Sequence, residues 1–170
     1  MVRSVVQQRG PHTVAKVDLT TESSMAYDHI KDALRRLGAR VFESRPNYIE
    51  LTARVGTLEL TKQVLVDSDP YVESSEPRAC FIPFRLRAAE GDVWYPVFDG
   101  ALIAVPGPYG TTIAMQGSYR PPIGIPGEVA NAAVLHYLAE QSLTSLLMRA
   151  ASALRDAASG TRDLIGHPYS

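Results

Sequence analysis

The stretch GSYRPPIGIPG at residues 117–127, followed by EVANAAVLHYLAEQSLTSLLMRAASALRDAA at residues 128–158, decides the fold. Pro121, Pro122 and Pro126 interrupt both a strand ladder and a helix interior, so the chain turns between a strand and a helix. The second segment contains neither proline nor glycine, and Gly160 is placed to end it. A helix of about thirty residues is about 45 Å long at ~1.5 Å per residue. Such a helix needs a long partner surface.

One face of this predicted helix is apolar. Arg149, Arg155, Asp156 and Tyr137 are expected to point away from it. The charged residues also interrupt the apolar run, so the helix is not expected to span a membrane. Small or aliphatic side chains and one histidine recur on the apolar face at about 100° per residue: Val129, Ala132, His136, Ala139, Leu143, Leu146, Leu147, Ala150 and Leu154.

Composition narrows the class of protein. A chain of 170 residues with 45% hydrophobic and 21% charged residues is typical of one globular domain. The net charge of −1 gives no reason to expect nucleic acid or an anionic membrane as partner. One cysteine, Cys80, excludes an intramolecular disulfide and a cysteine-rich metal site. We expect a cytoplasmic protein with no metal and no cofactor, and a homodimer is compatible with the sequence.

The spacing of apolar residues predicts the elements of the rest of the chain. Residues 1–12 are expected to be a loose tail, residues 13–158 a single domain, and residues 159–170 a second tail. A first strand is predicted over residues 13–19, with N-cap candidates from Thr20 to Ser24, and a helix over residues 25–37 that Gly38 ends. Alternating apolar residues predict strands over most of residues 40–119, with bulges or bends at Pro83 and Pro96.

This order predicts an α+β fold. Sequential strands joined by short turns form an antiparallel meander, and a curved sheet must cover one apolar face. The last helix is the only predicted element long enough to cover it. We therefore expect a helix-grip architecture, in which a curved antiparallel sheet of about six to seven strands wraps around the long C-terminal helix.

The segments VWYPVFDGALIAVPGPYGTTIAMQGSYRPPIGIPG, at residues 93–127, and AVLHYLAEQSLTSLLMRAASAL, at residues 133–154, resemble the SRPBCC or START-like superfamily. The likeness is to bacterial members whose last strand ends in G-x-Y-R-P-P-x-G, and it covers about residues 13–158. This resemblance implies a helix-grip fold with a deep pocket between sheet and helix. Members bind lipids, polyketides or other apolar molecules, and some are cyclases or dehydratases.

Catalytic motifs are absent from the sequence: it has no H-E-x-x-H, C-x-x-C, G-x-S-x-G, P-loop or G-x-G-x-x-G. Cys80 lies on an apolar strand face, where an inert buried thiol is favoured over a nucleophile. His136 is the candidate catalytic residue because it lies on the apolar face of the last helix. It is read either as a core histidine that hydrogen-bonds a carbonyl or Glu140, or as a group that orients a ligand or transfers a proton.

Other candidate ligand-binding residues come from the inner faces. Lys62 is in phase with an apolar strand face, and it either extends to solvent or supplies a cation for an acidic ligand head or for Asp99. Tyr119 and Arg120 stand at the entrance to the last helix, where a structural role is favoured. The expected apolar wall of the pocket consists of Ile82, Phe84, Leu86, Ile113, Met115, Ala139 and Leu143.

Three functions remain open at this point. The favoured one is binding of a small hydrophobic molecule that is lipid-like, polyketide or aromatic. The second is an enzyme of the polyketide cyclase or dehydratase type that uses His136. The third is a protein-interaction domain whose core is filled.

Overall fold

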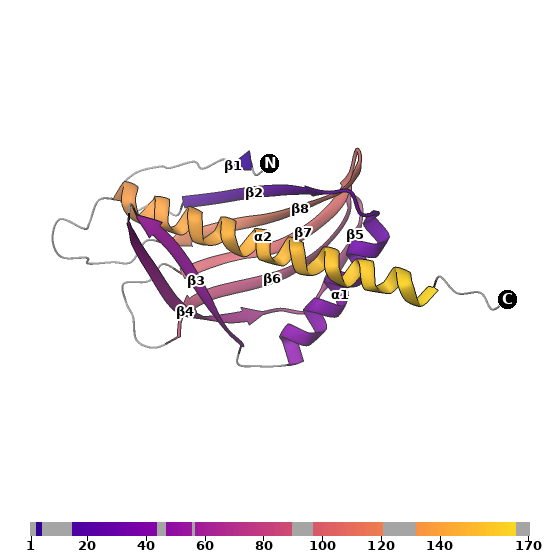
Figure 1. Ribbon diagram of the computed structural model, residues 1–170, viewed down its shortest axis with the longest axis horizontal. Coiled ribbons are helices and arrows are strands. Elements are labelled where there is room, and N and C mark those ends of the chain that lie inside the picture. Colours follow the sequence, from indigo (N-terminus) through magenta and orange to yellow (C-terminus); the bar gives the residue numbers. More distant parts are fainter. Residues whose placement is uncertain are drawn as a thin grey trace.

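The computed structural model describes residues 3–4, 15–43, 47–55, 57–89, 97–120 and 132–165 of the chain. Over these residues, one antiparallel sheet curves around a long helix, α2 (Ala132–Ile165), which lies lengthwise across a single face of the sheet (Figure 1). A shorter helix, α1 (Tyr27–Glu43), packs against one end of the sheet and against α2. The strands are β1 (Arg3–Ser4), β2 (Ala15–Ser23), β3 (Asn47–Val55), β4 (Leu58–Ser68), β5 (Val72–Ser75), β6 (Arg78–Ala88), β7 (Val97–Gly107) and β8 (Gly110–Arg120).

The strand order is β1-β2-β8-β7-β6-β4-β3, with β5 added beside β6. The meander predicted from the short turns is confirmed from β6 to β8, and the PGPYG segment forms the hairpin turn in which Gly107 pairs with Gly110. The predicted α+β helix-grip fold is therefore confirmed. The position of β2 beside β8, the last strand, is a long-range pairing that local periodicity does not indicate.

Pro83 lies at the point on β6 where the neighbouring strand changes from β4 to β5. β4 pairs with β6 as far as Ser68 opposite Phe84, and β5 resumes the pairing at Val72 opposite Phe81. Pro83 has no N–H to donate to that edge. Its carbonyl instead accepts a hydrogen bond of 2.9 Å from the backbone N–H of Asp69. A bulge or bend was expected at Pro83: the pairing of β6 with β7 continues unbroken through Pro83 opposite Ala101, and the irregularity lies on the other edge, between β4 and β5. Pro96 lies outside the described residues.

Three predicted boundaries are wrong. Helix α1 continues through Gly38 to Glu43, and the missing side chain lets the helix approach β6, since a Cβ at Gly38 would lie 3.1 Å from Cδ1 of Ile82. Helix α2 continues through Gly160 to Ile165, because a glycine permits a helix end without requiring one. Strand β2 extends to Ser23, which pairs with Thr111 of β8 while its hydroxyl accepts a 3.2 Å hydrogen bond from the backbone N–H of Met25. The short β1 also falls inside the segment that was read as a tail.

The core lies between the inner face of the sheet and the two helices. Leu147 is fully buried in it, next to Leu143, Ala151 and Leu154 on the same face of α2. The predicted apolar face of this helix is thus confirmed where the structure describes its side chains. The sheet contributes fully buried residues such as Leu19, Val64, Leu86, Ile113 and Met115.

Two facing glycines allow the central strands to pack closely. Gly100 of β7 pairs with Gly117 of β8. A Cβ at Gly117 would lie 2.4 Å from the carbonyl oxygen of Asp99 and 2.7 Å from Cζ of Phe98. The Phe98 ring therefore occupies the space above this glycine pair, and its centroid lies 5.5 Å from that of Phe84. The absence of two side chains at this point makes room for an aromatic layer on the inner face.

Candidate ligand pocket

A pocket of about 390 Å³ lies between the sheet, α2, the C-terminal half of α1 and the start of β3. Its walls come from seven elements that span most of the described chain: α1, β3, β4, β6, β7, β8 and α2. Most of the lining side chains are apolar. The lining residues are Leu37, Val41, Asn47, Tyr48, Ile49, Val66, Ser68, Ile82, Phe84, Leu86, Leu102, Met115, Leu146, Arg149, Ala150 and Ala153.

The floor of the pocket follows from strand alternation. Ile82, Phe84 and Leu86 are two residues apart on β6 and therefore point to the same face of the sheet. Ile82 pairs with Leu102 of β7, and Leu102 pairs with Met115 of β8, so these three lie in one row across three strands. Ile82, Leu86, Leu102 and Met115 are each buried. These four side chains give the sheet side of the pocket a buried, apolar floor.

The helices supply the opposite wall. On α2, Leu146, Arg149, Ala150 and Ala153 follow the spacing i, i+3, i+4 and i+7, which places them on one face beside the buried face of the helix. The alanines leave space where larger side chains would fill the pocket. On α1, Leu37 and Val41 face the pocket one turn apart. Val41 belongs to the turn of α1 beyond Gly38, so the unexpected continuation of this helix provides part of the wall.

Polar groups gather at the mouth. Nη1 of Arg149 donates a 2.9 Å hydrogen bond to the carbonyl oxygen of Glu50 on β3. The side-chain amide of Asn47 donates to the carbonyl oxygen of Val41. Tyr48 is half exposed, and Arg149 and Ala153 are exposed as well, which marks the side that opens to solvent. Arg149 was expected to point away from the ligand side, but the structure places it among the lining residues.

Of the predicted apolar wall, the structure brings Ile82, Phe84, Leu86 and Met115 together in the pocket. Ile113 and Leu143 are buried in the core and do not line it. Ala139 is half-buried against the same core. The predicted ligand contacts of these last three residues remain predictions, and the pocket lies further along α2, toward Ala150.

The predicted polar site residues are spread over the fold. Lys62 is exposed on β4, opposite Leu51, and is not among the lining residues. Asp99, which was suggested as a partner of Lys62, forms an ion pair with Arg85 on the neighbouring strand, and the role of Lys62 stays a prediction. Arg120 is exposed at the end of β8. The side chain of His136 lies outside the described residues, so its role stays a prediction.

Tyr119 is buried next to the inner face of α2. It is 4% exposed and pairs with Phe98 across the β7–β8 ladder. Burial raises the pKa of its hydroxyl to about 12, and the Glu140 carboxylate adds to this rise. The hydroxyl therefore stays protonated near neutral pH, and Tyr119 lies outside the pocket lining.

Cys80 is the other residue with potential reactivity. It is fully buried, its thiol faces the carbonyl oxygen of Ala104 at 3.8 Å, and burial raises its pKa. These features agree with the predicted inert thiol, because the nucleophilic form is the thiolate.

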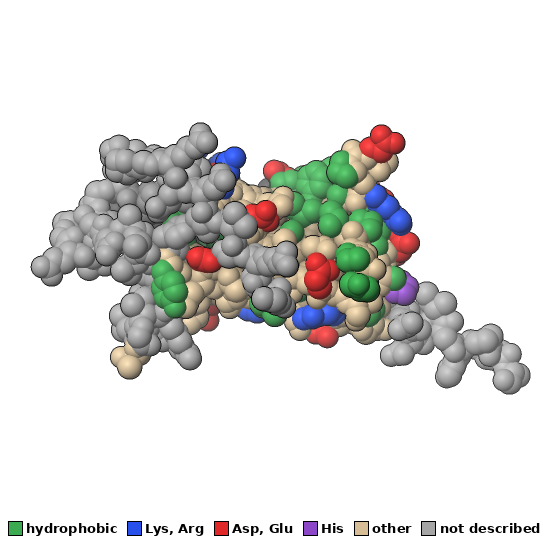
Figure 2. Space-filling model, turned by 90° about the horizontal axis from the view of Figure 1, so that it is seen from above, with side chains coloured by type: hydrophobic (Ala, Val, Ile, Leu, Met, Phe, Trp, Pro, Cys, Tyr) green, Lys and Arg blue, Asp and Glu red, His purple; other side chains and the backbone are tan. Residues whose placement is uncertain are grey.

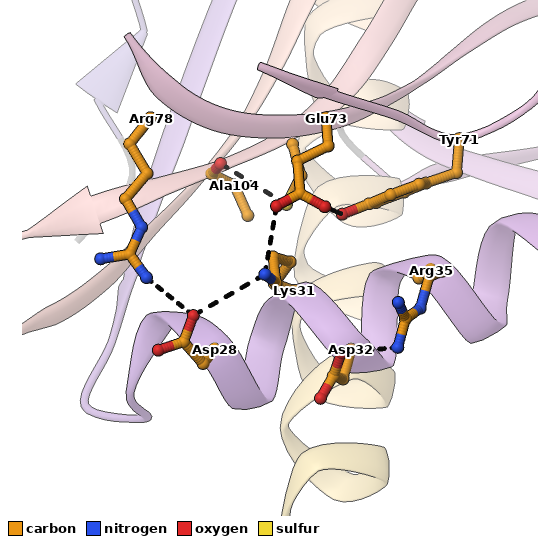
Figure 3. Close-up of polar contacts among 9 residues, drawn as sticks. Asp28, Lys31, Asp32, Arg35, Tyr71, Glu73, Arg78 and Ala104 are labelled. Atoms are coloured by element: carbon orange, nitrogen blue, oxygen red, sulfur yellow. Dashed lines mark hydrogen bonds and ion pairs between the residues drawn. The ribbon is translucent and has the colours of Figure 1, made fainter. Parts of the chain in front are cut away.

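Charged side chains connect α1 to the β5–β6 hairpin. Lys31 bonds Glu73 at 3.1 Å, and Arg78 bonds Asp28 at 2.7 Å (Figure 3). The hydroxyl of Tyr71 donates to Glu73 from the same side. Exposed ion pairs of this kind each contribute ~0–1 kcal/mol. They orient α1 on the sheet rather than form a site.

Among the polar residues that line the pocket, sequence reasoning missed Asn47, Tyr48, Ser68 and Arg149. Only Arg149 had a usable signal, because its spacing from Leu146, Ala150 and Ala153 places all four on one helix face. The others become neighbours only when β3, β4 and α2 are assembled.

The outer surface has no dominant sign of charge on the face seen from above, where acidic and basic side chains are interspersed (Figure 2). Within the described ranges, no group of three or more histidine, cysteine, aspartate or glutamate side chains could hold a metal ion. None of the helices, over the part of the chain that the structure covers, is long and apolar enough to cross a membrane.

Comparison with solved structures identifies the architecture. A STAR-related lipid transfer protein fragment from Xanthomonas axonopodis superimposes with a TM-score of 0.51 at 16% identity, over 86% of this chain and 93% of that chain. The chain has the START-like helix-grip fold. A member of the major latex protein family from Arabidopsis thaliana aligns at 15% identity over 80% of this chain and 95% of its own, with a TM-score of 0.36. No family model and no curated protein matches the sequence. The likeness to the START-like superfamily therefore concerns the fold.

Proposed function

We propose that this protein binds a small, mainly apolar molecule in the pocket between the sheet and α2. The observation that carries the proposal is the pocket itself, about 390 Å³ in volume with an aliphatic floor. Ligand pockets typically measure ~300–1,000 Å³ and combine apolar walls with a few polar groups. The Xanthomonas protein of the same fold is named a lipid transfer protein, which is consistent with a lipid-like ligand.

The pocket favours ligand binding over a filled-core interaction domain. Close packing normally leaves few voids larger than a water molecule. Here, Ala150 and Ala153 of α2 line the same open volume as Ile82 and Phe84 of β6. Larger residues on α2 would fill that space and stabilise the core, so an open volume suits a bound molecule.

The direct test is native mass spectrometry of the protein purified from its own host, where we expect a co-purified apolar molecule. A second test measures binding of dodecanoate and of a hydrophobic fluorescent dye. Ala150→Phe should abolish binding of both, because the ring occupies the pocket. The matched control Ala157→Phe places the same ring on an exposed position of α2 and should bind normally. If the parent binds neither probe, or if Ala150→Phe binds as well as the parent, the proposal is wrong.

A further inference from the structure

We infer that the ligand is a single-chain amphiphile with an anionic head group, and that Arg149 holds this head at the mouth of the pocket. The inference rests on the proposed function and adds the chemical class of the ligand. Three observations lead to it: the charge at the mouth, the absence of charge on the floor, and the volume.

Arg149 is the only charged residue among the described residues that line the pocket. Its guanidinium donates to a backbone carbonyl, that of Glu50, and takes part in none of the ion pairs formed within the described ranges. Arginine carries five N–H donors in a planar fork that matches a carboxylate or phosphate. The bond to Glu50 fixes the position of the guanidinium without neutralising its charge. The remaining donors are thus available to an anion.

The floor determines the orientation of such a ligand. Ile82, Leu86, Leu102 and Met115 are buried and offer no polar atom in their side chains. Placing an ionised head against them would remove its hydration without replacement, which costs far more than burying a neutral group. The tail must therefore point inward, and the head must stay beside Arg149. Tyr48 adds a half-exposed phenol at the same rim.

The volume limits the number of chains. A water molecule occupies ~30 Å³ in the liquid. A pocket of about 390 Å³ therefore holds on the order of thirteen groups of that size. One alkyl chain of medium length, or one aromatic system of similar size, fills this space. The two chains of a diacyl lipid exceed it.

The test compares three probes with the same alkyl chain: dodecanoate and dodecyl phosphate, each below its micelle concentration, and dodecanol, below its solubility limit. Calorimetry or displacement of a bound dye gives the affinities. We expect the parent to bind at least one anion about tenfold or more tightly than dodecanol, as a charge-assisted hydrogen bond provides. If dodecanoate binds more tightly than dodecyl phosphate, the head group is a carboxylate. If dodecyl phosphate binds more tightly, the head group is a phosphate monoester.

The variant Arg149→Met should remove this preference by weakening the binding of both anions relative to dodecanol, because methionine offers no cation to the head group. Arg149→Lys, which keeps the charge but loses the fork, should retain part of the preference. The control Arg155→Met removes a charge from the same helix outside the pocket lining and should behave like the parent. Circular dichroism and thermal unfolding establish that each variant is folded.

The inference is overturned if the parent binds dodecanol as tightly as both anions, or if the preference survives in Arg149→Met. In either case, dodecanol binding would still support an apolar pocket, so the proposed function would stand. If no probe binds the parent, the inference and the proposed function both fail.

Discussion

Neighbouring leucines on α2 provide a sensitive test of the fold and of the position of the pocket. Leu147 is fully buried in the core, whereas Leu146 is half-buried and lines the pocket. The same substitution, leucine to alanine, should therefore have different consequences at the two positions. Helix propensity does not separate the variants, because both residues lie inside the same helix.

For Leu147→Ala, we expect a loss of about 2–5 kcal/mol in the free energy of unfolding, since truncation leaves a new cavity that close packing cannot collapse. At ~2–4 °C per kcal/mol for a domain of this size, the midpoint of thermal unfolding should fall by about 4–20 °C. Leu146→Ala should cost less than about 2 kcal/mol, because its side chain is already partly exposed and its removal only enlarges an existing pocket.

Urea unfolding followed by circular dichroism measures both free energies under the same conditions. The slope of the transition should be unchanged, which would show that the unfolded states are comparable. If Leu146→Ala destabilises the protein as much as Leu147→Ala, the assignment of one face of α2 to the core and the adjacent face to the pocket is wrong. A cost below about 1 kcal/mol for Leu147→Ala would refute the same assignment.

Three further predictions concern other parts of the fold. Gly117→Ala should destabilise the protein by about 1–3 kcal/mol, because the new methyl group would collide with the backbone of β7 and the ring of Phe98; a variant with parental stability in urea would contradict the close approach of these strands. Ala150→Phe should unfold with a stability within about 1–3 kcal/mol of the parent while losing binding, since the ring enters an existing space; loss of folding would show that the space is smaller than described. Stability should also fall as the pH rises from about 10 toward about 12, because the unfolded chain releases the Tyr119 proton near pH 10 while burial retains it in the native state. Measurement of unfolding against pH should show a shallower decline for Tyr119→Phe, and an unchanged decline would argue against the burial of this hydroxyl.

The sequence by itself determined the order of elements and the long terminal helix. Apolar residues at every second position mark one face of a strand, and apolar residues that recur with a period of about 3.6 mark one face of a helix. Both patterns involve only residues that are close in the sequence. The sequence alone therefore indicates which side of each element faces the core. The turn at Gly107–Gly110 was predictable for the same reason, because it follows from the chemistry of single residues. Phe84, Leu86 and Met115 were correctly expected to share one apolar space.

Other features were decided only by the tertiary structure. The pairing of β2 with β8, two strands about ninety residues apart along the chain, depends on which sheet edge is available after the meander forms. Gly38 remains inside a helix because Ile82 packs against the side where its Cβ would lie. The pocket lies near Ala150 rather than Ala139 because α1 and β3 close around that part of α2. Arg149 is polar and exposed, as its sequence suggests, and only the approach of Glu50 from another element brings it to the mouth of an apolar pocket.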